Sequence, residues 1–139
     1  MSFLADYSQF ARDFSRYLSL AKRQQQPIGL LLLAIPLTVM SSNPALAGRL
    51  AQALRYQVRQ EDLVGFWENR WIGIALYGSS RSAAQQRLHD LVHQDEWWQA
   101  SDRALGVDSR TTVGSGLAIF PEDGENFLTL LHRAQQQCL

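Results

Sequence analysis

The sequence predicts an α+β fold: a ferredoxin-like β-α-β-β-α-β core, an antiparallel sheet with helices on one face, and an extra N-terminal helix. Three patterns support this prediction. They are the apolar run "IGLLLLAI" at residues 28–35, two alternating segments on either side of the turn Glu68-Asn69-Arg70, and helical spacing of apolar residues elsewhere. A chain of 139 residues has the length of one domain and can bury a core without disulfides.

Charge and hydropathy exclude several classes of protein. The chain has 13 Lys and Arg against 13 Asp and Glu, so no net field attracts it to nucleic acid or to an anionic membrane. Its longest apolar run is far shorter than the ~20 residues of a membrane-spanning helix. The single Cys138 has no partner for an intrachain disulfide, which fits a reducing compartment. We therefore expect a cytoplasmic protein that neither binds nucleic acid nor inserts into a membrane.

Residues 1–26 are expected to form an amphipathic N-terminal helix, separate from a domain at residues 27–139. Apolar positions at alternating steps of four and three place one aromatic stripe along residues 3–23: Phe3, Tyr7, Phe10, Phe14, Tyr17 and Ala21. The stripe has two alternative uses. It can pack on the domain's own sheet, or, because the spacing is a heptad, pair with a second copy in a homodimer.

The first half of the core follows from the buried run at residues 28–35, which predicts a central strand covered on both faces. Asn43 and Pro44 then supply an N-cap and a first helical residue. The buried face of that helix is expected to consist of Leu46, Leu50, Ala53, Leu54 and Val58. The hairpin comes next, with Leu63 and Trp67 on one face of the first strand and Val64 and Phe66 on the other. Asn69 suits the positive φ that a tight hairpin turn requires.

The second half of the core has its own start and stop signals. Ser82 with Gln85 predicts a capping box that begins a helix running to about His93. Residues 111–120 are rich in β-forming residues and end at Pro121. Asp123 is then expected to cap a last helix, whose buried face is Phe127, Leu130, Leu131 and Ala134.

Two segments resemble the diguanylate cyclase (GGDEF) family. "RQEDLVGFWENRWIGIAL" at residues 59–76 is similar to the family pattern RxxDLVxRYGGDEFxxxL, and "VGSGLAIFPEDGENFLTLLHRA" at residues 113–134 is similar to VSxGIAxxPxDGxxxxxLLxxAD. The resemblance extends over roughly residues 15–139. It implies that the predicted core is of the GGDEF or nucleotide cyclase type, and that residues 27–139 are a degenerate member.

The departures from the family pattern fall on its metal site. In active members the GGDEF turn cradles GTP, and its third residue, an acid, binds divalent metal together with an Asp at the end of the first strand. Here the five motif positions read Glu68, Asn69, Arg70, Trp71 and Ile72. The two Asp positions of the strand pattern read Ala34 and Pro36. Because Mg²⁺ is held mainly by oxygen ligands such as carboxylates, the resemblance implies that the metal site is lost.

A third departure is a deletion. The family segment FKxxNDxxGHxxGD, which contributes base recognition, is shortened to "TVMSSNPALAG" at residues 38–48. Together the three losses predict a catalytically inactive GGDEF-like domain that serves as a regulatory or protein-interaction module, with a protein partner and no metal or cofactor. An active nucleotide cyclase is the third alternative, after a receptor for cyclic di-GMP.

Arg59 and Asp62 stand where the family's RxxD inhibitory site binds cyclic di-GMP. An arginine can hold a phosphate or a guanine edge with two hydrogen bonds, so a receptor for cyclic di-GMP is the second alternative. The structural alternative is an Arg at a helix end and an Asp in the following turn, both solvated.

The hairpin turn has two readings of its own. Glu68, Arg70 and the neighbouring Trp67 and Trp71 have the composition of a protein-interaction site, with Asn69 between them. Alternatively, the aromatic residues lie in the sheet under helices while the charges keep the turn soluble.

The histidines and the remaining tryptophans also have two interpretations each. His89 and His93 lie one helical turn apart, and with Glu96 they suggest a metal site; the alternative is an exposed helix face. His132 has no partner in the sequence. Trp97 and Trp98 can dock on a partner or close one end of the core.

Overall fold

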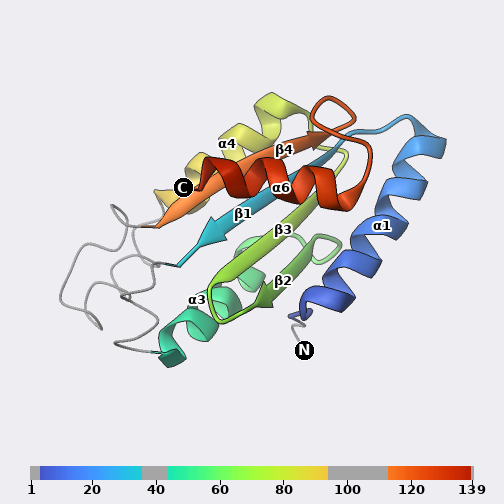
Figure 1. Cartoon of the computed structure of the whole chain (residues 1–139). Coiled ribbons are helices and arrows are strands. Elements are labelled where there is room, and N and C mark those ends of the chain that lie inside the picture. Colours follow the sequence, from blue (N-terminus) through green and yellow to red (C-terminus); the bar gives the residue numbers. More distant parts are fainter. Residues whose placement is uncertain (1–3, 36–43, 94–112, 139) are drawn as a thin grey trace.

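The computed structural model describes residues 4–35, 44–93 and 113–138. Its elements follow in the predicted order (Figure 1): α1 (Tyr7–Gln24), β1 (Ile28–Ala34), α3 (Pro44–Gln57), β2 (Leu63–Trp67), β3 (Trp71–Tyr77), α4 (Arg81–Val92), β4 (Gly114–Phe120) and α6 (Phe127–Gln137). The β-α-β-β-α-β core with an added N-terminal helix is therefore confirmed. Phe3, Pro36, Asn43, Glu96, Trp97 and Trp98 lie outside the described residues.

The four strands form one antiparallel sheet in the order β2-β3-β1-β4. β1 is central and pairs with both β3 and β4, so that Leu31 lies opposite Ile74 on one side and Leu117 on the other. Every residue of β1 is buried, as its continuous apolar sequence predicts. The order places the carboxyl end of β1 beside the hairpin that joins β2 to β3.

Helices cover both faces of the sheet, so the prediction of helices on one face is wrong. α3 and α4 pack over one face through Leu50, Leu54, Ala84 and Leu91, while α1 and α6 pack over the other (Figure 1). The physical reason lies in the strands, whose side chains are apolar on both faces and need cover on both. In the hairpin, Leu63 and Trp67 face α1 and α6, whereas Val64 and Phe66 face α3, as their alternation predicts.

The aromatic stripe of α1 packs inside its own chain. Phe10 and Phe14 are fully buried, and their rings lie 5.9 and 5.3 Å from that of Phe127 in α6. Of the two alternatives for the stripe, the structure shows packing on the domain's own sheet for Phe10 and Phe14, whose buried side chains keep no surface for a homodimer seam. The helix begins at Tyr7 because Asp6 caps it, its carboxylate accepting a hydrogen bond from Gln9 N at 2.8 Å.

Two other helix caps differ from the prediction. Ser80, not Ser82, caps α4 by accepting from Ala83 N at 3.3 Å, and Asn126, not Asp123, caps α6 by accepting from Thr129 N at 2.9 Å. The Asp123 carboxylate does not cap the helix because it already accepts hydrogen bonds from Ile119 N and Arg81. Within the described part of the chain, no helix is both long and apolar enough to cross a membrane.

α6 approaches β4 very closely, and a glycine permits it. A Cβ built on Gly116 would lie 2.0 Å from the carbonyl oxygen of Ala134, a distance that no side chain could occupy. Further along the same helix, the side-chain amide of Gln137 donates to Leu117 O at 2.7 Å and accepts from Leu117 N at 3.0 Å. The outer edge of β4 is thereby hydrogen-bonded by a helix side chain in place of another strand.

Candidate functional site

The hairpin turn between β2 and β3 is tight and partly strained. Arg70 N donates to Trp67 O at 3.2 Å, and the two residues between them both have positive φ, 56° for Glu68 and 52° for Asn69. Asn tolerates this conformation, as predicted, whereas Glu adopts it at a greater steric cost. The turn therefore holds one residue in a conformation that glycine would adopt without strain.

Arg70 does not extend into solvent. Its Nε donates to the carbonyl oxygen of Ile35 at 3.2 Å, while Ile35 N donates to Arg70 O at 2.8 Å. The guanidinium carbon also lies 4.8 Å from the centre of the Trp71 ring. The side chain is half-buried and places a positive charge at the carboxyl end of β1.

The surroundings of this charge are largely apolar. Ala34, in the last position of β1, is 3% exposed and lies opposite Trp71 and Gly114 in the two neighbouring strands. Cys138 interacts electrostatically with Arg70. Burial raises the pKa of the Cys138 thiol to about 11, and the positive charge of the guanidinium opposes that rise. Ile72 is fully buried in the core on the α3 and α4 side.

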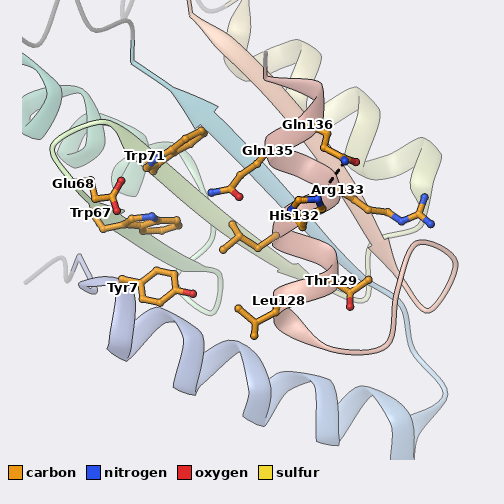
Figure 2. A pocket seen from close by; sticks show the side chains of 11 residues that line it. Tyr7, Trp67, Glu68, Trp71, Leu128, Thr129, His132, Arg133, Gln135 and Gln136 are labelled. Atoms are coloured by element: carbon orange, nitrogen blue, oxygen red, sulfur yellow. Dashed lines mark hydrogen bonds between the residues drawn. The ribbon is translucent and has the colours of Figure 1, made fainter.

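A groove of about 930 Å³ opens beside the turn, between the hairpin, α6 and the start of α1 (Figure 2). Trp67 and Trp71 line it, although each is only 8% exposed, and Glu68 stands at its hairpin side. Two exposed apolar side chains, Tyr7 and Leu128, stand at the α1 side and at the start of α6. The polar residues that α6 adds to the groove are Thr129, His132, Arg133, Gln135 and Gln136.

The contribution of α6 to this groove was not predicted from the sequence. His132 and Arg133 occupy the exposed positions of an amphipathic helix, a pattern that any solvated helix face shares. The pairing of α6 with the hairpin across some 60 residues of sequence depends on the sheet order, which no local signal in the sequence reveals.

Arg59 and Asp62 contact each other, but only one of them is solvated. The Asp62 carboxylate is buried and accepts from Arg59 N at 3.0 Å and from Arg59 Nη2 at 3.3 Å. The expectation that both side chains are solvated is therefore wrong for Asp62. Arg59 keeps 53% of its side-chain surface exposed and lines a small cavity of about 280 Å³ with Arg87 and Ser79.

Arg55 completes the structure of this loop. Its two Nη atoms donate to the carbonyl oxygens of Arg59, Gln60 and Asp62 at 2.6 to 3.1 Å. These charge-assisted bonds satisfy backbone carbonyls between the end of α3 and the start of β2. The RxxD segment is thus built into the connection that leads into the hairpin.

The histidines fall into two places. His89 and His93 stack on each other at the end of α4, with ring centres 4.1 Å apart. His132 lies on α6, where its Nε2 is 3.2 Å from Gln136 Nε2. Among the residues that the structure describes, no group of three or more His, Cys, Asp or Glu side chains could hold a metal ion.

No protein-family model matches the sequence, and no curated protein matches it significantly. Solved structures do match. The isolated GGDEF domain of YfiN (TpbB) from Pseudomonas aeruginosa superposes with a TM-score of 0.76 at 22% identity, over 99% of this chain and 83% of that one. The chain has the fold of a GGDEF domain.

Two further GGDEF structures agree. The active GGEEF domain of a diguanylate cyclase from Vibrio cholerae has a TM-score of 0.75 at 14% identity, over 98% of this chain and 89% of that one. The GGDEF domain of DgcB from Caulobacter crescentus, solved in complex with c-di-GMP, has a TM-score of 0.71 at 14% identity, over 96% and 80%. At such identities the match concerns the GGDEF fold alone.

The GGDEF fold confirms the type of core that the resemblance implies. Its hairpin lies beside the carboxyl end of β1, so the two segments that carry the departures at the metal site are neighbours in space. At that junction of the described chain stand the cation Arg70 and the methyl group of Ala34.

Proposed function

We propose that this GGDEF-type domain does not synthesise cyclic di-GMP and acts as a regulatory or protein-interaction module. The observation that carries the proposal is the position of Arg70. Where the resemblance places a metal-binding acid, a guanidinium is hydrogen-bonded to Ile35 O, the residue next to Ala34. A divalent cation at this point would meet the positive charge of Arg70, whose Nε lies 3.2 Å from Ile35 O. Neither Ala34 nor Arg70 supplies a carboxylate that could hold the cation.

Loss of the metal would remove the chemistry that phosphoryl transfer needs. Metal ions neutralise the charge that develops on the transferring phosphate, and protein groups at this site would have to replace them. A single arginine can hold a phosphate but supplies no activated hydroxyl and no general base. Calorimetry with GTP in the presence of Mg²⁺ should therefore show no binding; saturable binding at the hairpin would count against the proposal.

The groove beside the turn supports the interaction part of the proposal. It combines aromatic side chains at its base with the exposed apolar residues Tyr7, at 37%, and Leu128, at 66%. Aromatic side chains in partly desolvated pockets are the usual anchors of protein interfaces. In this interpretation Trp67 and Trp71 provide the base of the contact surface, Glu68 its edge, and Asn69 and Arg70 fix the shape of the turn.

A quantitative pull-down tests the groove with a matched control. Leu128→Asp adds a charge to the groove, and Tyr56→Asp adds the same charge to a residue that is 73% exposed and does not line it. We expect partners captured by the unaltered chain to be lost with Leu128→Asp and kept with Tyr56→Asp. Equal capture by the two variants would show that the groove is not the contact surface.

A receptor for cyclic di-GMP is the second candidate, and one observation favours it. Arg59 and Arg87 bring two guanidinium groups to the same small cavity, and Arg59 is half-exposed. The buried Asp62 carboxylate, already bonded to Arg59, counts against direct contact between Asp62 and a ligand. Calorimetry with cyclic di-GMP separates the candidates: micromolar binding that Arg59→Ala abolishes supports the receptor, and absence of heat supports the interaction module.

A further inference from the structure

The outer edge of β4 is covered by groups of its own chain. Gln137 Nε2 donates to Leu117 O at 2.7 Å, and Leu117 N donates to Gln137 Oε1 at 3.0 Å. Two residues further on, Ile119 N donates to the Asp123 carboxylate at 2.8 Å, and Asp123 N donates to Ile119 O at 2.7 Å. The backbone groups that these two residues of β4 direct away from β1 are therefore all hydrogen-bonded.

The side-chain amide of Gln137 bonds to Leu117 as a residue of a neighbouring strand would. In an antiparallel pair, two opposite residues exchange both backbone hydrogen bonds, so each offers the other one donor and one acceptor. A primary amide carries a donor and an acceptor on one planar group. Gln137 thus takes the place of a residue in an added strand.

Two glycines of β4 allow the last turn of α6 to come this close to the strand (Figure 1). A Cβ built on Gly116 would lie 2.0 Å from Ala134 O, and one built on Gly114 would lie 2.5 Å from Cys138 O. A larger residue at either position would push the helix away. The Cys138 thiol also donates to Leu32 O in β1 at 3.7 Å, so the end of α6 is held against two strands.

β4 has the composition of a strand that pairs readily. Its sequence, GSGLAIF, contains no charged residue and no proline. Its apolar side chains serve both faces of the sheet, Leu117 and Ile119 on the α3 and α4 side and Ala118 and Phe120 on the α1 and α6 side. Natural sheets protect such an edge with charges, with proline or with a covering segment. At Leu117 the cover is one exposed side chain.

The edge of β2, on the opposite side of the sheet, is covered by backbone. Ala5 forms a parallel bridge with Gly65, in which Ala5 N donates to Val64 O at 3.0 Å and Phe66 N donates to Ala5 O at 2.9 Å. Removing that cover would require the chain before α1 to move. Removing the cover of Leu117 requires a change in Gln137 alone.

We propose that the edge of β4 is a pairing surface for β4 of a second copy of this chain, and that Gln137 covers it. Antiparallel pairing of two identical strands is self-complementary about a twofold axis. A strand without charges carries no pattern that selects a different partner. The surface is separate from the groove beside the hairpin, which Gln137 and Leu117 do not line.

The register of this pairing follows from the groups that remain covered. With the axis at Gly116, Leu117 of each copy exchanges its two bonds with Ser115 of the other. Asp123 then stays bonded to Ile119, and the turn before α6 does not have to move. Loss of the Gln137 amide is therefore sufficient to expose the pairing surface.

Hydrogen exchange of the full chain tests the cover. Gln137→Ala removes it, Gln137→Lys removes it but adds a charge that opposes edge pairing, and Gln136→Ala is the control, because Gln136 bonds to His132. In dilute protein the Leu117 amide should exchange at least about tenfold faster in both Gln137 variants than in the unaltered chain or the control. The Ile119 amide, held by Asp123, should stay protected in all variants, which also shows that each is folded.

Sedimentation velocity over a range of protein concentrations tests the pairing. Gln137→Ala should form dimers at least about tenfold more tightly than the unaltered chain, and its Leu117 amide should regain protection as dimers form. Gln137→Lys and Gln136→Ala should sediment as the unaltered chain does. Unchanged exchange of the Leu117 amide, equal association of Gln137→Ala and Gln136→Ala, or equal dimers in Gln137→Lys would overturn the proposal.

Discussion

Arg70 Nε lies 3.2 Å from the carbonyl oxygen of Ile35 and joins the hairpin turn to the end of β1 by a side-chain hydrogen bond. The backbone bond from Ile35 N to Arg70 O, at 2.8 Å, runs in the opposite direction. The two residues thus form a closed pair of hydrogen bonds at the junction where the resemblance places a metal. An arginine in this position acts as a structural tie.

Arg70→Ala should lower the free energy of unfolding by about 1–2 kcal/mol, because it leaves the carbonyl of the buried Ile35 without its side-chain donor. Urea unfolding measures the change. Arg133→Ala, which removes an exposed guanidinium from α6, is the control and should stay within about 0.5 kcal/mol. Equal effects of the two substitutions would show that the Arg70 bond contributes nothing specific.

Glu68→Gly should stabilise the domain by about 1 kcal/mol, since glycine adopts a φ of 56° without the steric cost that Glu bears. The midpoint of urea or thermal unfolding measures it. Glu125→Gly, in an exposed loop outside the turn, provides the comparison. A stability loss in Glu68→Gly would mean that the Glu68 side chain makes a contribution larger than the strain.

Gly116→Ala should destabilise the domain by about 3 kcal/mol or more, because its methyl group would overlap the carbonyl of Ala134 and push α6 off the sheet. Gly48→Ala is a matched control. Gly48 lies inside α3, its added Cβ would be 3.9 Å from Phe66, and the change should stabilise by about 0.5–1 kcal/mol. The opposite order of stability would contradict the packing of α6 on β4.

Asp62→Ala should cost about 1.5–3 kcal/mol, since it removes a buried carboxylate that accepts from both the backbone and the side chain of Arg59. Glu61→Ala, next to it and exposed, should have little effect. Chemical denaturation compares the two. If Asp62→Ala were as stable as the unaltered chain, Asp62 would be free for a ligand, and the receptor would gain support.

Cys138 should resist alkylation in the folded domain. Burial raises the pKa of its thiol to about 11, so the reactive thiolate is scarce at pH 8 and increases only as the pH approaches that value. The rate of reaction with iodoacetamide, measured against pH in the folded and the urea-unfolded chain, checks this. Similar alkylation rates for folded and unfolded protein at pH 8 would contradict the burial of the thiol.

The raised pKa of Cys138 also affects stability. Any stability that the neutral thiol contributes is fully present below the pKa of the unfolded chain and is lost as pH rises through about 11.

The sequence predicted which helices and strands form better than it predicted the residues at which the helices begin. The run at residues 28–35 and the alternation of Leu63, Val64 and Trp67 gave the central strand and the two faces of the hairpin, because periodicity reports burial directly. The caps at Ser82 and Asp123 were wrong because several residues nearby can cap, and only the three-dimensional path of the chain selects Ser80 and Asn126.

The candidate site was predicted in part. Arg70 could be placed in the turn from its position in the motif, but its bond to Ile35 could not, since it depends on β1 and β3 being neighbours. The burial of Asp62 was missed, because an acidic residue in a turn is usually solvated. The groove against α6 is lined by residues that are far apart in the sequence, and no local pattern in the hairpin or in α6 predicts it.

The most direct test of the central claim is turnover of GTP. The purified chain should be incubated with GTP and Mg²⁺, and separately with Mn²⁺, with the active Vibrio cholerae GGEEF domain treated in parallel as the positive control. Separation of the nucleotides by chromatography should show unchanged GTP with this chain and cyclic di-GMP with the control. Cyclic di-GMP formed by this chain, and lost when Arg70 is replaced by Ala, would contradict the claim that Arg70 marks an inactive site.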